Sequence, residues 1–477
     1  MARSGLEFFP FTPSSFMPDQ DPLSGITGAD RARFVRESMP SAGLFGGVNW
    51  RVSPDPFALD DSIADEIESM GRILLQFYRA VNLLYRRSVD GRSPGWVARW
   101  LDMGKPQSLI EFQRSHAFKN ETPRVIRPDI LLTSKGICIT ELDSVPGGIG
   151  LTAWLNQTYS QLPPDSNLAI LGGQDGMVRG FDSIFVDSPA VHVVVSRESE
   201  MYRPEMEWLC QQLGSRFTVR DTRFLDFQNG DSVYRFFELF DLSQVESAAK
   251  ILDLASNGAV FLTPPPKPIF EEKMLFALFW NRNLRSFWRQ ELGEGFMSRL
   301  EKWIPYTWLM DPAPMPPQAA IPGGLDLTDW NQLKALSQKE RDLILKISGF
   351  SEKAWGARGV YLGSDLSTPE WSAAVDAALR DFETSPHVLQ RFLKPAQVAS
   401  RWYDFSRQEM VDMPGRARLC PYYFVSGQGD RARPALGGVL ATVVPADKKI
   451  VHGMSEAILA PCARSVPSPT KSATKLL

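Results

Sequence analysis

Two short apolar segments near residue 130 constrain this chain more than any other feature of its sequence. Residues 130–133 and 137–140 are rich in β-branched and apolar side chains, and Ser134-Lys135-Gly136 separates them. Glycine at the end of that turn permits a positive φ, which a tight connection between antiparallel strands often requires. The pattern therefore predicts a β-hairpin.

Acidic side chains flank this hairpin. Arg127 and Asp129 alternate along the first strand, and Glu141 and Asp143 alternate along the second. Alternate residues of a strand share a face, so folding at the turn can bring the three carboxylates to one point. Such a group repels itself unless a cation lies within it, and an all-oxygen cluster suits Mg²⁺. Pro146-Gly147-Gly148 then ends the strand and brings bare backbone beside that point. A surface hairpin with solvated acids is the alternative.

Composition limits the classes of protein that fit. With 477 residues, the chain is expected to form two to four packed lobes. A net charge of -3 gives no general attraction to nucleic acid or to an anionic membrane. The sequence has no apolar run of about 18 residues and no secretory signal, so we expect a cytoplasmic protein without a membrane or nucleic-acid partner. The four cysteines lack CxxC spacing, which argues against a zinc site and a disulfide scaffold.

The order of local patterns predicts how the chain is divided. Apolar residues at steps of three or four predict a helix over 61–87, and alternating strand and helix patterns over 168–219 predict a small parallel sheet. Gly172-Gly173 lacks the GxGxxG spacing, so it is either a plain turn or a substrate-facing loop. The expected regions are an N-terminal arm and helical cap (1–125), a metal-binding hairpin (126–165), a small α/β domain (166–255), nucleotide-binding lobes (256–464) and a disordered tail (465–477).

A lysine followed by a glycine-bearing loop supplies a second chemical signal. Residues 342–347 read as a strand that carries Lys346, and the loop that follows contains Arg358. A fixed ammonium group and a loop with free backbone N–H groups suit a triphosphate. The loop is not of the GxxxxGK[ST] type, and a glycine-rich hairpin without a ligand is the alternative.

The acidic hairpin resembles the metal-binding strands of the ATP-grasp superfamily. The shared order is Arg-x-Asp, then Glu-x-(Asn or Asp)-x-x-Pro-Gly, which begins at Arg127 and at Glu141 in this chain. The resemblance implies ATP and two Mg²⁺ ions, which Mn²⁺ can replace, with Asp129, Glu141 and Asp143 as metal ligands. It also implies that Arg127 contacts the reacting carboxylate or acyl phosphate. Many members have Asn where this chain has Asp143, a change that keeps the oxygen donor and adds charge.

Other segments extend the resemblance over residues 125–460. FEEKMLFALFW, which contains Lys273, is similar to the first nucleotide-lysine segment of glutathionylspermidine-synthase-like members, although a lone lysine at a helix start is usually solvated. Residues 387–393 resemble the strand that pairs with adenine, with Gln390 where Glu is common. No acidic residue that would grip the ribose can be assigned. The implied nucleotide contacts are Lys273, Lys346, Ser348, Gly349, Gly356, Gly359, Gln390 and Phe392, and the implied catalytic arginines are Arg127, Arg358 and Arg418.

In this chain the hairpin precedes the lysines, whereas the usual ATP-grasp order places it last. The resemblance therefore implies a circularly permuted ATP-grasp fold, an α/β protein with α+β lobes, a small parallel-sheet domain before the nucleotide lobes and an N-terminal helical region. It further implies an ADP-forming ligase that joins a small-molecule or peptide carboxylate to an amine through an acyl phosphate. An ATP-dependent phosphotransferase and a non-catalytic nucleotide-binding scaffold are the alternatives. The oligomeric state stays open, a homodimer included.

Overall fold

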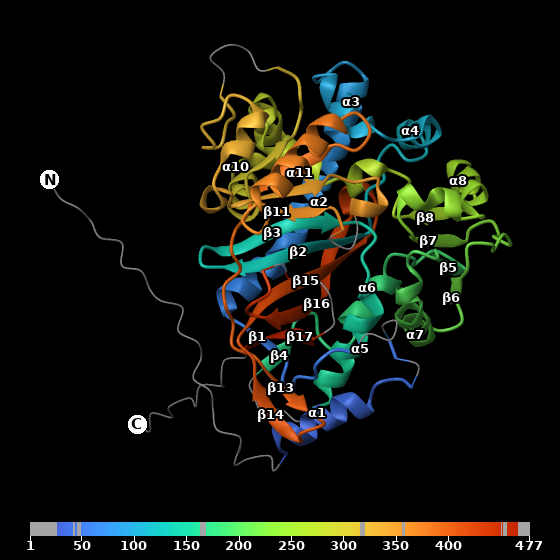
Figure 1. Cartoon of the computed structure of the whole chain (residues 1–477). Helices are drawn as coiled ribbons and strands as arrows, with labels where there is room; N and C mark the ends of the chain where they lie inside the picture. Colours follow the sequence, from blue (N-terminus) through green and yellow to red (C-terminus); the bar gives the residue numbers. More distant parts are fainter. Residues whose placement is uncertain are drawn as a thin grey trace, which may run out of the picture.

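The chain is organised around one large, mainly antiparallel sheet that three smaller sheets surround (Figure 1). The computed structural model describes residues 26–41, 43–44, 49–162, 168–314, 320–354, 358–449, 451 and 456–465. Three expectations lie wholly or partly outside these residues: the first 25 residues of the N-terminal arm, Gly356, and the disordered tail from 465.

The large sheet joins segments from both ends of the chain. Its strands lie in the order β1-β17-β16-β15-β2-β3, and β4 pairs with β17. Their bounds are β1 (Phe57–Leu59), β2 (Val125–Thr133), β3 (Gly136–Asp143), β4 (Leu168–Ile170), β15 (Gly415–Ser426), β16 (Arg433–Pro445) and β17 (Ile458–Ser465). The predicted hairpin is confirmed as β2 and β3, which pair in antiparallel fashion. Gly136, with φ of 105°, closes the turn, and the Thr133 hydroxyl accepts a hydrogen bond from Lys135 N at 3.1 Å.

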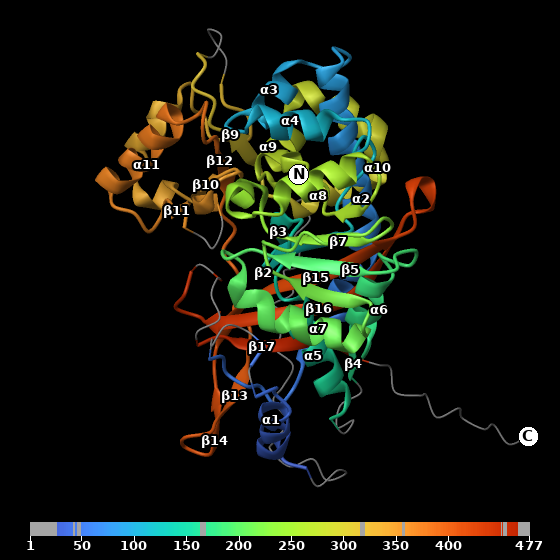
Figure 2. The same ribbon diagram turned by 90° about the vertical axis from the view of Figure 1, so that its right-hand side faces the viewer.

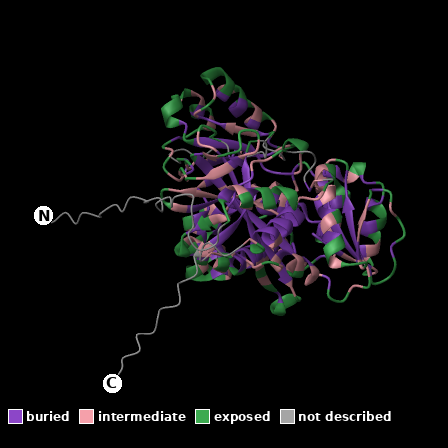
Figure 3. Ribbon diagram, turned by 90° about the horizontal axis from the view of Figure 1, so that it is seen from below, coloured by how far each residue is buried: buried purple, intermediate pink, exposed green. Residues whose placement is uncertain are grey.

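Helices cover both faces of this sheet. Val439 and Ala441 of β16 pack in the same cluster as α2 (Asp61–Val89), whereas Leu440 between them packs with α5 (Ile149–Ser160). Since alternate residues of a strand point to opposite faces, α2 and α5 lie on opposite sides of the sheet. Further helices extend these layers: α3 (Trp96–Asp102), α4 (Gln107–Arg114), α6 (Gly176–Asp182) and α10 (Arg285–Trp303). Figure 3 shows the buried residues concentrated in the sheets and on the inner sides of the helices.

The predicted parallel sheet is also present, in the order β6-β5-β7-β8 (Figure 1, right). Its elements are β5 (Val191–Val195), α7 (Arg203–Leu213), β6 (Phe217–Arg220), β7 (Ser232–Phe236), α8 (Ala248–Ser256) and β8 (Phe261–Thr263). The strand expected at 168–171 does not join it, because β4 pairs with β17 of the large sheet. Gly172 after β4 forms a turn against Gly437, where an added Cβ would lie 2.1 Å from the carbonyl oxygen, and α6 follows the turn.

A third sheet forms a separate small lobe above the large sheet (Figure 2). Its antiparallel order is β11-β10-β12-β9. The elements of this lobe are α9 (Met274–Trp280), β9 (Thr307–Leu309), β10 (Leu343–Ile347), β11 (Val360–Leu362), α11 (Thr368–Arg380) and β12 (His387–Arg391). The strand predicted to carry Lys346 and the strand predicted over 387–393 are neighbours in it.

The remaining sheet is the pair β13 (Arg401–Asp404) and β14 (Glu409–Asp412), which contacts α1 (Gly28–Glu37) at the far end of the molecule. All four cysteines are buried and free, as expected from their spacing. In the part of the chain that the structure describes, no helix combines the length and apolarity that a membrane crossing requires.

Candidate active site

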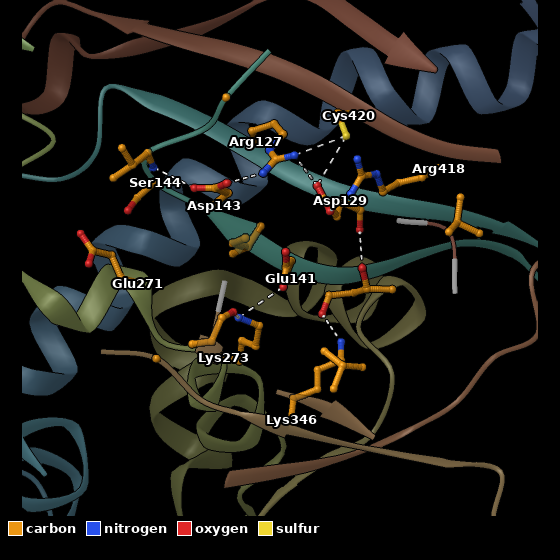
Figure 4. A pocket seen from close by; sticks show the side chains of 18 of the residues that line it. Arg127, Asp129, Glu141, Asp143, Ser144, Glu271, Lys273, Lys346, Arg418 and Cys420 are labelled. Carbon is orange, nitrogen blue, oxygen red and sulfur yellow. Dashed lines mark hydrogen bonds and ion pairs between the residues drawn. The ribbon is translucent and has the colours of Figure 1, made fainter. Parts of the chain in front are cut away.

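A cavity of about 520 Å³ lies where the large sheet, the parallel sheet and the small lobe meet (Figure 4). Its volume falls in the range of small-molecule sites, which is about 300–1,000 Å³. Of the predicted site residues, the structure brings the following to its lining: Arg127, Asp129, Glu141, Asp143, Lys273, Lys346, Gly349, Arg358, Gln390, Phe392 and Arg418. Ser348 and Gly359 are not part of the lining, and Gly356 lies outside the described residues.

The register of the hairpin explains why its charged residues face the cavity together. Arg127 lies opposite Asp143, and Asp129 lies opposite Glu141. Residues directly opposite each other in an antiparallel pair project from the same face. All four side chains therefore point to one side of the sheet, as the sequence indicated for the acids.

Two arginines neutralise Asp129. Its Oδ1 lies 2.8 Å from Arg127 Nη1, and its Oδ2 lies 3.2 Å from Nη1 of Arg418 on the adjacent strand β15. Arg127 also pairs with Asp143 through Nη2. Burial opposes the charge of Arg127, but Asp129 and Asp143 outweigh it and raise the pKa of Arg127 well above its usual value. The cations that separate the hairpin acids in this structure are thus side chains.

Glu141 faces the two predicted lysines. Lys273 Nζ lies 3.4 Å from Glu141 Oε2 and donates to Ala354 O at 3.0 Å. Lys346 Nζ donates to Thr140 O at 3.1 Å, one residue before Glu141. Burial would raise the pKa of Glu141, but the surrounding positive charges, Lys273 first among them, lower it to about 2. Burial lowers the pKa of Lys346, and Glu141 partly offsets that effect.

Gln390 holds Lys346 in place. Its Oε1 accepts from Lys346 Nζ at 3.0 Å, while its Nε2 donates to Thr307 Oγ1 at 3.0 Å. Residues of β10 and β9, the two strands beside β12, thus fix the amide of Gln390. The hydrogen bonds that hold Lys346 are accepted by groups without formal charge. Phe392, just beyond β12, adds an aromatic side chain to the cavity lining.

A buried network joins the region of α3 and α4 to the segment that contains Lys273. Lys105, between α3 and α4, pairs with Glu272, and the hydroxyl of Ser348 donates to the same carboxylate. Both charged side chains are only 1% exposed. Ser348 also accepts from Met274 N at 2.9 Å, and its carbonyl accepts from Lys273 N at 2.8 Å. Ser348 therefore anchors the segment that presents Lys273, with its hydroxyl directed into this network.

The glycine loop approaches the cavity at its start and at its end. An added Cβ on Gly349 would lie 2.5 Å from Glu271 O, so only glycine fits this close approach. Arg358 lines the cavity and pairs with Glu198 of the parallel-sheet region at 3.1 Å. Gly359 lies behind the lining, where its carbonyl accepts from Ile347 N at 3.2 Å.

A buried carboxylate positions the backbone after the hairpin. Glu205 of α7 accepts from Gly148 N at 2.6 Å and from Leu151 N at 2.8 Å, at the start of α5. The side chain is fully buried without a paired cation, and burial raises its pKa to about 7 against the opposing effect of the two N–H groups. Gly148 has φ of 89° and lies close to Tyr422, so this loop admits little change.

Several residues of the lining were not identified from the sequence: Tyr202, Glu238, Glu271, Cys420 and Tyr422. Glu238 follows β7 at the carboxyl end of the parallel sheet. Ligands of open α/β sheets gather at these strand ends, and this rule would have identified the position. Cys420 lies on β15, and its thiol contacts Asp129 Oδ1 at 3.5 Å, a pairing of residues 291 apart that no local pattern indicates.

The donor groups fit ATP well and Mg²⁺ in part. Nε of Arg127 and Nε of Arg418 are buried without a hydrogen-bond partner, and such donors suit an anionic ligand. The oxygen-only donors suit Mg²⁺, and the side chains of Glu141 and Asp143 keep 33% and 22% exposure in the cavity. Both oxygens of Asp129 are taken up by arginines. Among the described residues, no three His, Cys, Asp or Glu side chains are arranged to hold a metal ion.

Comparisons with known proteins place the fold. No family model matches the chain. A curated cysteine desulfurase from Frankia sp. (strain EuIK1) is 33% identical over 103 residues, which span 20% of this chain and only 23% of that protein. The solved apo structure of a glutathione synthetase-like effector (GSS30) from Globodera pallida is similar, with a TM-score of 0.53, 10% identity and coverage of 91% of this chain and 96% of that one. The chain thus has a mixed α/β fold that it shares with this synthetase-like effector.

Proposed function

We propose that this protein is an ATP- and Mg²⁺-dependent ligase that joins a carboxylate to an amine. The observation that carries the proposal is the meeting of Lys273, Lys346 and the acidic hairpin in one cavity. These groups come from distant parts of the chain and from different sheets, and each has the charge that a triphosphate site needs. The likeness in fold to a glutathione synthetase-like effector agrees with this chemistry.

We assign the residues of the cavity lining to separate roles according to their charge. Lys273 and Lys346 would bind the phosphates, and the first part of the glycine loop, with Arg358, would cover them. Gln390 and Phe392 would line the adenine end of the cavity. Glu141 and Asp143 would hold Mg²⁺, and Asp129 would join them if Arg127 or Arg418 turned toward the substrate. Mg²⁺ would supply charge neutralisation to the β- and γ-phosphates.

The reaction needs no enzyme nucleophile. The substrate carboxylate attacks the γ-phosphorus of ATP, which releases ADP and gives an acyl phosphate. The amine then attacks the acyl carbon, phosphate leaves, and the amine proton passes to solvent or to a nearby base. Arg127 and Arg418, with their unpartnered Nε–H groups, would stabilise the negative charge of the carboxylate and of the acyl phosphate.

Trapping with hydroxylamine tests the proposal. The protein is incubated with Mg²⁺-ATP, a panel of carboxylates and hydroxylamine, and hydroxamate and ADP are measured together. We expect stoichiometric hydroxamate from at least one carboxylate, and loss of turnover in Glu141→Gln but not in Glu409→Gln, a change in an exposed side chain far from the cavity.

Other outcomes would identify the alternatives. A phosphorylated acceptor that is stable to hydroxylamine would show a phosphotransferase, and no calorimetric signal for Mg²⁺-ATP would show a protein without a nucleotide site. Intact Mg²⁺-dependent turnover in Glu141→Gln would overturn the metal assignment. We also propose that the order of elements is a circular permutation of the usual ATP-grasp order.

A further inference from the structure

The wall of the cavity next to the parallel sheet is acidic. Glu238 follows β7, and Glu271 ends the 3₁₀ turn η3 (Pro268–Glu271) just before α9; both line the cavity. Glu271 is held at both oxygens: Arg235 Nη2 lies 2.6 Å from Oε1, and Leu239 N donates to Oε2 at 3.1 Å. Glu238 lies near enough to Glu271 for the two carboxyl groups to influence each other's protonation.

The charges of this wall are out of balance. Arg235 is 1% exposed and also donates to the carbonyls of Phe237 and Pro264, so one guanidinium serves the two carboxyl groups. Burial, then the charges of Glu271 and Asp143, raise the pKa of Glu238 well above its usual value. In the ligand-free protein a proton on Glu238 therefore takes the place of a second cation, in contrast to the arginine-rich hairpin opposite.

An unpartnered hydroxyl faces the same cavity. Ser144, at the end of β3, is 2% exposed and lines the cavity, and its Oγ has no hydrogen-bond partner. η3 contacts β3, and Figure 4 shows Glu271 on the side of the cavity that carries Asp143 and Ser144, away from Lys346. A buried hydroxyl without a partner is costly. A hydroxyl can accept as well as donate, so a ligand that donates hydrogen bonds would suit both Ser144 and the carboxyl group of Glu271 on the same side of the cavity.

An ammonium group would suit both the carboxyl groups of Glu238 and Glu271 and the unpartnered hydroxyl of Ser144. It carries one positive charge and three N–H donors and has no acceptor. Phosphate and carboxylate groups would be repelled here, whereas the cluster of Lys273, Lys346, Arg127 and Arg418 suits them. The cavity thus has a cationic end and an acidic end.

We propose that Glu238, Glu271 and Ser144 form the subsite that binds the ammonium group of the acceptor substrate, an alkylamine or amino compound in its charged form. This inference rests on the proposed ligase and assigns its amine side. The subsite would hold the ammonium group next to the acyl group that Arg127 and Arg418 would bind. The ammonium must then pass one proton to a carboxylate of the subsite or to solvent before its nitrogen can attack the acyl carbon.

The test measures amine binding without nucleotide, so that it does not depend on catalysis. Binding of n-butylamine and of n-butanol to the full-length protein is followed by NMR at neutral pH. The two probes match in size and differ in charge. We expect saturable binding of butylamine and at least about 10-fold weaker binding of butanol, because a hydrogen bond to a charged group is worth about 1.5–3 kcal/mol.

Three variants assign the binding to this wall. Glu238→Gln keeps the shape of the side chain but cannot become a carboxylate when the ammonium binds, and it should weaken butylamine binding about 10-fold. Glu238→Lys supplies a tethered ammonium beside Glu271 and should abolish it. Glu121→Gln is the matched control, since Glu121 is a partly exposed ion-pair partner of Arg124 outside the cavity lining, and it should bind like wild type.

Equal binding of butylamine to wild type and Glu238→Gln, or equal binding of butylamine and butanol to wild type, would overturn the subsite. If the Gln variant fails to fold, the Lys variant and the wild-type comparison of the two probes still decide. Mg²⁺-ATP binding is measured on the same proteins. Amine binding without nucleotide binding would refute the ligase and keep the subsite, and the reverse would refute the subsite alone.

Discussion

The hairpin wall and the parallel-sheet wall of the cavity both bury carboxylates, yet they neutralise them differently. Asp129 and Glu141 face arginine and lysine side chains, which hold the pKa of Glu141 near 2. Glu238 on the second wall, and Glu205 of α7 outside the cavity lining, have no ion pair of their own within the described residues, and burial raises their pKa values. The difference teaches that burial alone does not decide the state of an acid. On the hairpin wall, cationic side chains of the protein neutralise the carboxylates. On the other wall, Glu238 is neutralised by a proton or by a ligand.

The largest expected effect comes from removing charge at the neutralised wall. Asp129→Asn would leave Arg127 and Arg418 buried without their shared partner, which should lower the free energy of unfolding by about 3–5 kcal/mol. Thermal and urea unfolding measure this change. Asp182→Asn breaks an ion pair with Arg216 in which Asp182 is 48% exposed, and it should change stability by no more than about 1 kcal/mol. Similar losses in both variants would mean that burial does not raise the cost of breaking the Asp129 ion pairs.

The second effect concerns pH at Glu205, a buried carboxyl group that pairs with no cation among the described residues. A carboxyl group whose folded pKa is raised stabilises the fold when protonated. The contribution of Glu205 should therefore be full below pH about 4.3 and be lost as pH rises to about 7. That loss amounts to about 3 kcal/mol. Urea unfolding from pH 4.5 to 8 should show this decline in wild type, and Glu205→Gln should lack it. Parallel pH profiles for the two proteins would contradict the assignment.

A third effect tests how the lysines are held. Lys346 lies against carbonyl and amide oxygens, so its charge is available to a ligand. Lys346→Met should weaken ATP binding about 100-fold, since removing a buried, hydrogen-bonded charge costs about 2–5 kcal/mol. Calorimetry with Mg²⁺-ATP measures it. Lys334→Met, at a lysine paired with Asp376 outside the cavity lining, is the control and should bind normally.

The smallest effect is expected at the mouth of the cavity. Arg358 and Glu198 pair at 3.1 Å across two regions, but the arginine side chain is 51% exposed. A double-mutant cycle with Arg358→Ala and Glu198→Ala should give a coupling free energy of about 0.5 kcal/mol, which falls as salt rises. A coupling free energy above about 2 kcal/mol would contradict the expectation that solvent exposure weakens the Arg358–Glu198 ion pair.

Local patterns predicted much of the fold. The helix at 61–87 became α2 because its apolar face has a clear period, and Gly136 fixed the hairpin turn. Asp60, at the N-cap of α2, makes no side-chain capping hydrogen bond, so the first turn relies on acidic charge alone. The strand at 168–171 was assigned to the wrong sheet because its partner, β17, lies near the far end of the chain.

The site shows the same limit. Residue types and order indicated Asp129, Lys273 and Lys346, and the structure brings them to one cavity. The pairing of Asp129 with Arg418 depends on the register between β2 and β15, which no window of sequence contains. Ser348 was expected to contact a nucleotide, and its hydroxyl instead binds Glu272, which a distant lysine orients. Glu238 and Glu271 carried no motif.

The central place of β15 beside β2 has a consequence during synthesis. Asp129 and its neighbour Cys420 are 291 residues apart, so the edge of the hairpin emerges from a ribosome long before the strand that covers it. At about 5–20 residues per second, that interval lasts roughly 15–60 seconds. During that time the backbone groups of β2 that later pair with β15 are exposed and can pair with other chains. We therefore expect the nascent chain to depend on chaperones that shield this strand until β15 is made.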